Sequence, residues 1–276
     1  MTINYEAKVN CELRRDKLKE ILKQQGTGLM LGGLMGTDMR IAKGAYRGGC
    51  RIFEPNHPAM ALQMGLYGAT TMNEAEAIRH LVPLERMTGA VEGLRATLGN
   101  DIFITCAVRG TFTEEQPVPF TQEDAFKIAY AGADCLHTHK SSIEDVAKIT
   151  EYAHNAGLLC EAYISAYDTF GVQAPTDETL LQAIKDYETA GVDLLGLCTG
   201  MIYQGQSATG FSEECTHRFE LFLENTHVFK VLEGGIKPGN IAAVRKIGFD
   251  ILVMSTALDN ILQDTTEKTV NQLMIM

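Results

Sequence analysis

The chain lacks the features that stabilise secreted mini-proteins or anchor a protein in a bilayer. Its seven cysteines are scattered over 276 residues and form no C-x-x-C pair. This usage predicts no disulfide framework and favours a reducing compartment. No apolar run approaches the roughly 18 residues that a membrane span needs, and the polar N-terminal segment does not resemble a signal peptide. We therefore expect a cytoplasmic protein that does not enter a membrane.

Positive charge is also scarce. The chain has 24 Lys and Arg against 35 Asp and Glu, which gives a formal net charge of −11. Nucleic acids and anionic membrane surfaces are bound by clustered Lys and Arg, so we expect neither partner. A small anion held by backbone N–H groups needs no net positive charge and stays compatible with this composition.

A short motif, Gly followed two residues later by Asp, recurs along the chain. It lies at residues 131–134, 190–193 and 247–250, each time directly before an apolar run. A Gly can end a helix by adopting a positive φ, and a short buried strand then follows. The three aspartates, at 134, 193 and 250, are 59 and 57 residues apart, which leaves room for two strand–helix units in each interval. Such alternation predicts a parallel sheet.

Counting the apolar, strand-like runs gives eight strands. They span about residues 28–34, 50–55, 101–108, 134–139, 158–164, 194–198, 228–232 and 250–254. An open doubly wound sheet would carry a G-x-G-x-x-G turn after its first strand, and Gly32, Gly33 and Gly36 lack that spacing. We therefore predict an α/β fold, a (βα)₈ TIM barrel, in which residues 1–276 form a single domain. An extra N-terminal helix within residues 1–25 should cover the bottom of the barrel.

Two loops suited to phosphate binding follow the last two predicted strands. The first contains Gly234 and Gly235, and the second contains Ser255 and Thr256. In TIM barrels a phosphate commonly lies between these two loops, where glycines let the backbone approach and free N–H groups donate to the oxygens. The alternative is that the glycines only turn the chain and the hydroxyls only cap a helix. Because both loops occur together, we predict a phosphate site.

Residues 232–258 resemble the corresponding end of the ribulose-phosphate-binding barrels, a superfamily that includes ribulose-phosphate 3-epimerase and N-acetylmannosamine-6-phosphate 2-epimerase. The loop at 199–207 is similar to the glycine-rich phosphate loop of the pentulose epimerase, which implies a phosphate contact at Gly205. Glu233 matches the acidic position on strand seven of both epimerases. The metal-binding histidines of the first enzyme and the lysine of the second have no counterpart here. The resemblance therefore implies a phosphorylated ligand and a homo-oligomer, but neither named activity.

Acidic and imidazole side chains gather at the predicted mouth of the barrel. Alternate residues of a strand point to opposite faces, which turns Glu54, His137, His139, Glu161 and Glu233 inward. All lie near the carboxyl ends of their strands, with His137 one layer deeper, and barrel enzymes carry their catalytic groups there. Burying several ionisable groups together is costly unless they are paired or bind a ligand.

These side chains suggest proton transfer. We predict Glu233 and Glu54 as an acid/base pair across the mouth, His139 as a second proton carrier and Glu161 as an additional member. The alternative for each residue is a hydrogen-bonded core position, and this alternative is strongest for His137. No cofactor is required by the pattern, but the imidazoles and carboxylates could also ligate a divalent metal.

The sequence leaves three functions open. The first is an epimerase or isomerase that moves a proton next to a carbonyl in a phosphorylated sugar or a similar phosphorylated metabolite. The second is a carbon–carbon lyase, of aldolase or decarboxylase type, on a similar ligand. The third is a barrel that binds a phosphorylated small molecule and has lost the reaction. An enzyme with acid/base chemistry is the main prediction.

Overall fold

The structure is a computed structural model. It describes residues 5–108, 119–140, 142–165, 172–199 and 211–275.

Eight parallel strands close into a barrel, as the sequence predicts. Their bounds are β1 Gly28–Leu31, β2 Ile52–Phe53, β3 Phe103–Ala107, β4 Cys135–Thr138, β5 Leu159–Ser165, β7 Leu194–Cys198, β8 Phe229–Glu233 and β9 Ile251–Met254. Each strand pairs with the next one in this order, and β9 returns to pair with β1. A short strand that the sequence did not predict, β6 (Val172–Gln173), pairs only with β5 and lies outside the closed barrel. The (βα)₈ TIM barrel is therefore confirmed.

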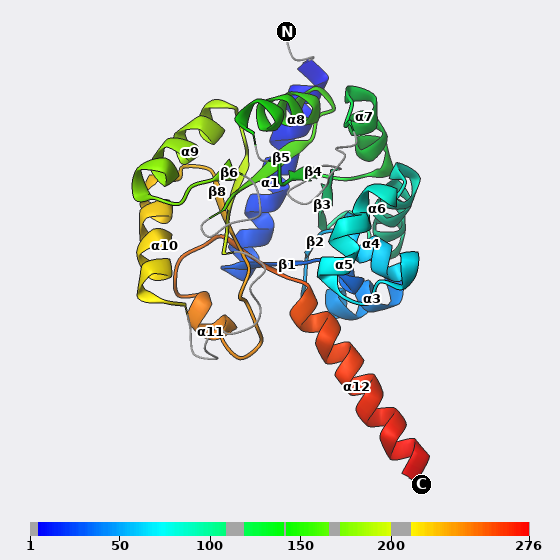
Figure 1. The fold of residues 1–276 in the computed structure, drawn as a ribbon. Coiled ribbons are helices and arrows are strands. Elements are labelled where there is room, and N and C mark those ends of the chain that lie inside the picture. Colours follow the sequence, from blue (N-terminus) through cyan, green and yellow to red (C-terminus); the bar gives the residue numbers. More distant parts are fainter. Residues whose placement is uncertain (1–4, 109–118, 141, 166–171, 200–210, 276) are drawn as a thin grey trace.

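Helices surround the barrel and extend beyond it (Figure 1). Their bounds are α1 Tyr5–Gln25, α2 Leu34–Thr37, α3 Met39–Arg47, α4 His57–Gln63, α5 Met72–Ile78, α6 Leu84–Leu98, α7 Gln122–Ala131, α8 Ile143–Asn155, α9 Asp177–Thr189, α10 Glu213–Asn225, α11 Ile241–Val244 and α12 Thr256–Ile275. Two short 3₁₀ helices, Leu66–Gly68 and Arg79–Leu81, lie in the long connection between β2 and β3. None of the described helices is both long enough and apolar enough to cross a bilayer.

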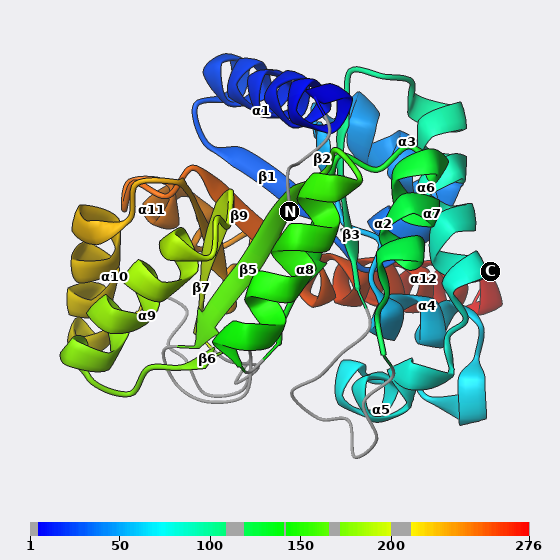
Figure 2. The same ribbon diagram turned by 90° about the horizontal axis from the view of Figure 1, so that it is seen from above.

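The predicted N-terminal helix closes the amino end of the barrel. Figure 2 shows α1 as a separate layer across this end. Leu18 and Ile21 of α1 are buried in one cluster with inward-facing side chains such as Met30 and Ile251. The helix therefore closes the core at one end and leaves the opposite end of the barrel free for a site.

The repeated aspartates have a structural role at the start of their strands. Each carboxylate accepts a hydrogen bond from a backbone N–H of the preceding barrel strand. The pairs are Asp134 with Ile104 at 2.9 Å, Asp193 with Cys160 at 3.0 Å and Asp250 with Lys230 at 2.8 Å. The glycines two residues earlier adopt positive φ, with values of +103° at Gly132, +85° at Gly191 and +110° at Gly248. The motif thus ends a helix and attaches the next strand to its neighbour.

The alternation of strand residues is as predicted. Ile52 and Cys135 pack in the cluster inside the barrel, whereas Phe53 and Leu136 pack with the surrounding helices. The side chain after Phe53 on the same strand face as Ile52 is Glu54, which is 5% exposed. The period of two residues therefore directs the acidic and imidazole side chains to the interior of the barrel.

The last helix leaves the body of the protein. Figure 1 shows α12 projecting away from the barrel, and none of its described residues is buried. Only its first residues, including Leu258 and Leu262, pack against the core. Leu273 and Ile275 near its end are 66% and 87% exposed.

Candidate active site at the carboxyl end of the barrel

A cavity opens at the carboxyl ends of the strands. Its polar lining comprises Glu54, Asn56, His57, Glu76, Arg79, His137, His139, Glu233, Ser255 and Thr256. Four of the five predicted mouth residues line the cavity, and the fifth, Glu161, does not.

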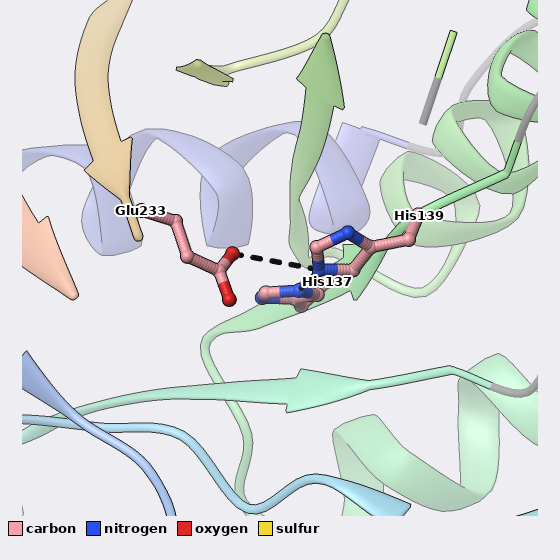
Figure 3. A group of neighbouring side chains, drawn as sticks. All are labelled: His137, His139 and Glu233. Carbon is pink, nitrogen blue, oxygen red and sulfur yellow. Dashed lines mark hydrogen bonds and ion pairs between the residues drawn. The ribbon is translucent and has the colours of Figure 1, made fainter. Parts of the chain in front are cut away.

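Two imidazoles at the end of β4 meet a carboxylate at the end of β8. The Nε2 atoms of His137 and His139 are 2.5 Å apart, and Nε2 of His139 is 3.6 Å from Oε2 of Glu233. Figure 3 shows the Glu233 carboxylate directed toward both rings. The ring of His139 stacks on that of Tyr163, with centroids 4.6 Å apart and an angle of 9° between the planes. Packing against Tyr163 therefore fixes the orientation of the His139 ring.

Glu161 lies beneath the imidazoles and is fully buried. Its carboxylate accepts hydrogen bonds from Thr105 Oγ1 at 2.7 Å and from Tyr163 Oη at 2.5 Å, and it lies 3.5 Å from His137 Nδ1. Burial alone would raise the pKa of Glu161, but the charge of His137 and the hydrogen bonds hold it below the ordinary value. Glu161 is thus a buried anion that positions His137, and its predicted place at the mouth is wrong because β5 sets it one layer deeper.

The two carboxylates predicted as an acid/base pair share the cavity. Burial, followed by repulsion from Glu161, raises the pKa of Glu54 to about 7, although the charge of His137 acts in the opposite direction. Burial and the negative charge of Glu54 raise the pKa of Glu233 to about 8. Carboxyl groups with such pKa values exchange protons near neutral pH, as general acid/base catalysis requires.

The two histidines differ in charge. Burial alone would lower the pKa of His137, but the carboxylates of Glu161 and Glu54 raise it to about 9. Burial and the neighbouring charge of His137 lower the pKa of His139 well below its ordinary value. At neutral pH His139 is therefore uncharged and offers a nitrogen lone pair, which suits a metal ligand or a proton acceptor.

The predicted phosphate loops come together beside the same cavity. Gly234, Gly235, Ser255 and Thr256 line a small adjoining pocket, which Glu233 also borders. The two glycines have φ values of 98° and 67°, a conformation that other residues rarely adopt. The Thr256 hydroxyl is buried without a hydrogen-bond partner among the described residues. Gly205, the fifth predicted phosphate contact, lies outside the described residues, and phosphate binding itself stays a prediction.

The connection after β2 supplies residues that the sequence did not single out. Arg79 and Glu76 are buried together, with Nη1 of the arginine 2.5 Å from Oε1 of the glutamate, and both line the cavity. Asn56 donates to Glu54 Oε1 at 3.3 Å. The sequence shows a helix in this region but does not show that the helix bends over the mouth, so these residues could not be assigned to the site.

A metal ion is compatible with one cluster in the cavity. His137, His139 and Glu233 each offer one ligand atom, and these three atoms lie within 4.8 Å of one another. Oε2 of Glu233 is buried and makes no hydrogen bond to the described residues, which leaves it available as a ligand. Imidazole nitrogens and a carboxylate oxygen form a common donor set for divalent metals. The residues therefore fit such an ion.

No protein-family description and no curated protein sequence matches the chain. Its structure is similar to that of phosphonopyruvate hydrolase in complex with oxalate and Mg²⁺, with a TM-score of 0.66, 12% identity and coverage of 94% of this chain and 86% of that chain. The structure of 2,3-dimethylmalate lyase, a member of the PEP mutase/isocitrate lyase superfamily, gives a TM-score of 0.63, 12% identity and coverage of 94% and 87%. Tryptophan synthase from Pyrococcus furiosus gives a TM-score of 0.63, 13% identity and coverage of 87% and 91%.

Identities this low show a shared fold and no more. The barrel predicted from the sequence agrees with all three structures. The expected membership of the ribulose-phosphate epimerases is not supported, because the named superfamily is that of PEP mutase and isocitrate lyase. The residues behind that expectation form a phosphate-type loop pair, which barrels of different families share. The chain is a (βα)₈ barrel with the same fold as enzymes that include lyases and hydrolases.

Proposed function

We propose that the protein is a carbon–carbon lyase, of aldolase or decarboxylase type, that acts on a small phosphorylated metabolite. One observation carries the proposal: carboxyl groups with pKa values near neutrality and a metal-binding type of cluster converge in one cavity beside the phosphate-type loops. The fold shared with 2,3-dimethylmalate lyase supports this class over an epimerase. The isomerase expected from the sequence has no such support.

Cleavage of a carbon–carbon bond leaves a pair of electrons that must be stabilised as an enolate, and it requires proton transfer at both ends. Glu54, with a pKa of about 7, can take a proton from a substrate hydroxyl and return it to the new carbanion. A divalent ion held by His137, His139 and Glu233 would supply positive charge for the enolate oxygen. Glu233 would then act as a ligand, in place of the base role that the sequence suggests.

A Schiff-base mechanism is the main chemical alternative for an aldolase. It needs a lysine inside the site, shielded from water. No lysine lines the cavity in the part of the chain that the structure describes. An enolate stabilised by charge therefore fits this site better than an enamine on lysine.

The substrate's anionic groups would be recognised at two places. Backbone N–H groups around Gly234, Gly235 and Ser255 would hold the phosphate, as at other barrel phosphate sites. Arg79, which lines the cavity and pairs with Glu76, would bind a carboxylate with its remaining N–H groups. This arrangement predicts a ligand with a phosphate at one end and an oxygen-rich carbon skeleton near the imidazoles.

The test is a screen of phosphorylated hydroxy acids and ketoses for cleavage, followed by NMR in deuterated water. A lyase incorporates deuterium at the carbon that becomes a carbanion, and Glu54→Gln should lower kcat at least about 100-fold. Glu92→Gln, an exposed acid on α6, is the matched control and should leave the rate unchanged. Deuterium exchange with inversion but without cleavage would contradict the lyase and restore the epimerase.

A further inference from the structure

We infer that His137, His139 and Glu233 form a site that prefers a transition-metal dication, such as Mn²⁺, Fe²⁺, Co²⁺ or Zn²⁺, over Mg²⁺. The inference deepens the proposed function, because the ion would lie in the same cavity as the substrate. It rests on the spacing of the donors, on a buried anion behind one imidazole and on the chemistry of the donor set.

The donors already converge. Two ligands that bind one ion at about 2.1 Å lie no more than about 4.2 Å apart. The His137–His139 nitrogens, at 2.5 Å, and the His139–Glu233 pair, at 3.6 Å, meet this limit. All three ligand atoms lie within 4.8 Å of one another, so binding of one ion would require the third donor to move closer by about half an ångström.

The surroundings of His137 select the nitrogen that faces the cluster. Its Nδ1 lies 3.5 Å from Oε2 of Glu161, so the carboxylate stabilises a proton on Nδ1, and Nε2 is the nitrogen directed toward the cluster. Metal-binding histidines usually have such a carboxylate behind them, which orients the ring and makes it a better ligand. Glu161 is itself fixed by Thr105 and Tyr163. The buried arrangement is therefore that of a metal ligand with its supporting shell.

The charges around the cluster favour a dication. Glu54, Glu161 and Glu233 bring three carboxyl groups to one buried region, whereas Arg79 is already paired with Glu76. Buried carboxylates are stabilised when they are paired or coordinate a metal. A dication beside Glu233 would pair with the carboxylate form of this side chain.

The donor types decide which ion. Mg²⁺ demands oxygen ligands and retains several waters, whereas imidazole suits Zn²⁺, Fe²⁺ and their neighbours. Two of the three donors here are imidazole nitrogens. The similar phosphonopyruvate hydrolase structure contains Mg²⁺. We therefore expect this chain to differ from that enzyme in its choice of metal.

The test uses Co²⁺ as a spectroscopic probe. Protein stripped with EDTA is titrated with Co²⁺, and we expect a visible d–d absorption band that saturates at one ion per chain by elemental analysis. A hundredfold excess of Mg²⁺ should leave the band unchanged. Absence of the band in folded protein, or its loss to equimolar Mg²⁺, would overturn the inference.

Variants locate the ion. His139→Gln should lower the Co²⁺ affinity at least about 100-fold, and Glu161→Gln should lower it about 10–100-fold by removing the carboxylate behind His137. His227→Ala, at a residue whose side chain is 78% exposed, is the control and should bind as the wild type does. Circular dichroism checks that each variant folds. If His139→Gln or Glu161→Gln does not fold, Glu233→Gln is measured in its place. Unchanged Co²⁺ affinity in folded His139→Gln and Glu233→Gln would overturn the site.

The metal site and the lyase activity are two proposals that can be tested independently of each other. Co²⁺ binding without cleavage of any substrate would leave this inference intact and contradict the lyase. Cleavage by EDTA-treated protein that also fails to bind Co²⁺ would support the lyase and overturn the metal site.

Discussion

The two ends of the barrel both bury acidic side chains, but they treat them in opposite ways. At the amino end, Asp134 lies 2.7 Å from Lys17 and 2.8 Å from Arg95, and it also accepts a backbone N–H. At the carboxyl end, Glu54 and Glu233 face each other and two imidazoles in a cavity. The first arrangement satisfies its charges and stabilises the fold. The second arrangement leaves the carboxyl groups of Glu54 and Glu233 in a cavity, where a substrate or an ion can contact them.

The pKa values reflect this difference. Burial would raise the pKa of Asp193 at the amino end, but hydrogen bonds from His154, the Cys160 N–H and Arg15 hold it below the ordinary value. Among the described residues Glu54 accepts a hydrogen bond from Asn56 at 3.3 Å and Oε2 of Glu233 accepts none, and burial raises their pKa values to about 7 and 8. A buried acid therefore indicates chemistry where few donors stabilise its charged form.

The largest expected effect on stability is at the amino end. Asp134→Ala would leave Lys17 and Arg95 without their partner and would free the Ile104 N–H. We expect a loss of about 3–5 kcal/mol in the free energy of unfolding, measured by urea denaturation. Asp16→Ala, whose partner Lys19 is exposed, should change it by less than about 0.5 kcal/mol. Equal effects of the two variants would contradict the contrast between the ends.

A positive-φ glycine at the mouth should give the next largest effect. Gly235→Ala places a side chain at φ +67° and should cost about 1–2 kcal/mol of stability. It should also weaken binding of inorganic phosphate, measured by calorimetry, because the same loop lines the proposed phosphate pocket. Gly239→Ala, in the same connection and with open space around it, is the control. A Gly235→Ala protein that binds phosphate as the wild type does would remove this loop from the site.

The pH dependence should have opposite signs at the two ends. Burial raises the pKa of Asp259, near the mouth, to about 6, so its contribution to stability is present at low pH and is lost as the pH rises through 6. Asp193 has a lowered pKa, so its contribution is present above pH ~4 and is lost as the pH falls. Relative to wild type, Asp259→Asn should therefore gain stability between pH 5 and about pH 7, measured by thermal unfolding. Asp193→Asn should be less stable than wild type by a constant amount between pH 5 and about pH 7, and this difference should shrink below pH ~4. A difference from wild type that shrinks with rising pH for Asp193→Asn, or that does not change with pH for Asp259→Asn, would contradict the assignment.

The smallest effect is expected at the far end of α12, which projects away from the barrel (Figure 1). Leu273→Asp should change the free energy of unfolding of a single chain by less than about 0.5 kcal/mol, because this side chain is 66% exposed. The homo-oligomer expected from the sequence remains a prediction, and the unpartnered apolar residues of α12 are where we expect its contact. A fall in the mass measured by analytical ultracentrifugation would place a second copy there, whereas an unchanged oligomeric mass would exclude this contact.

The sequence determined the barrel and the direction of its site residues, because both depend on local periodicity. The Gly and Asp of each junction, such as Gly132 and Asp134, act within one helix-to-strand turn, and strand alternation turns His137 and Glu233 inward. The interpretation as a ribulose-phosphate epimerase was not supported. A phosphate-type loop pair indicates where a barrel could bind a phosphate, but it does not indicate which reaction the barrel catalyses.

Only the tertiary structure decided which of these side chains meet. The 2.5 Å approach of the two imidazoles depends on side-chain rotamers and on the packing of Tyr163, and neither is encoded by spacing along the chain. Arg79 reaches the cavity because the long connection after β2 bends over the mouth. Contacts between distant segments are set by the packing of the whole chain, and no local pattern records them.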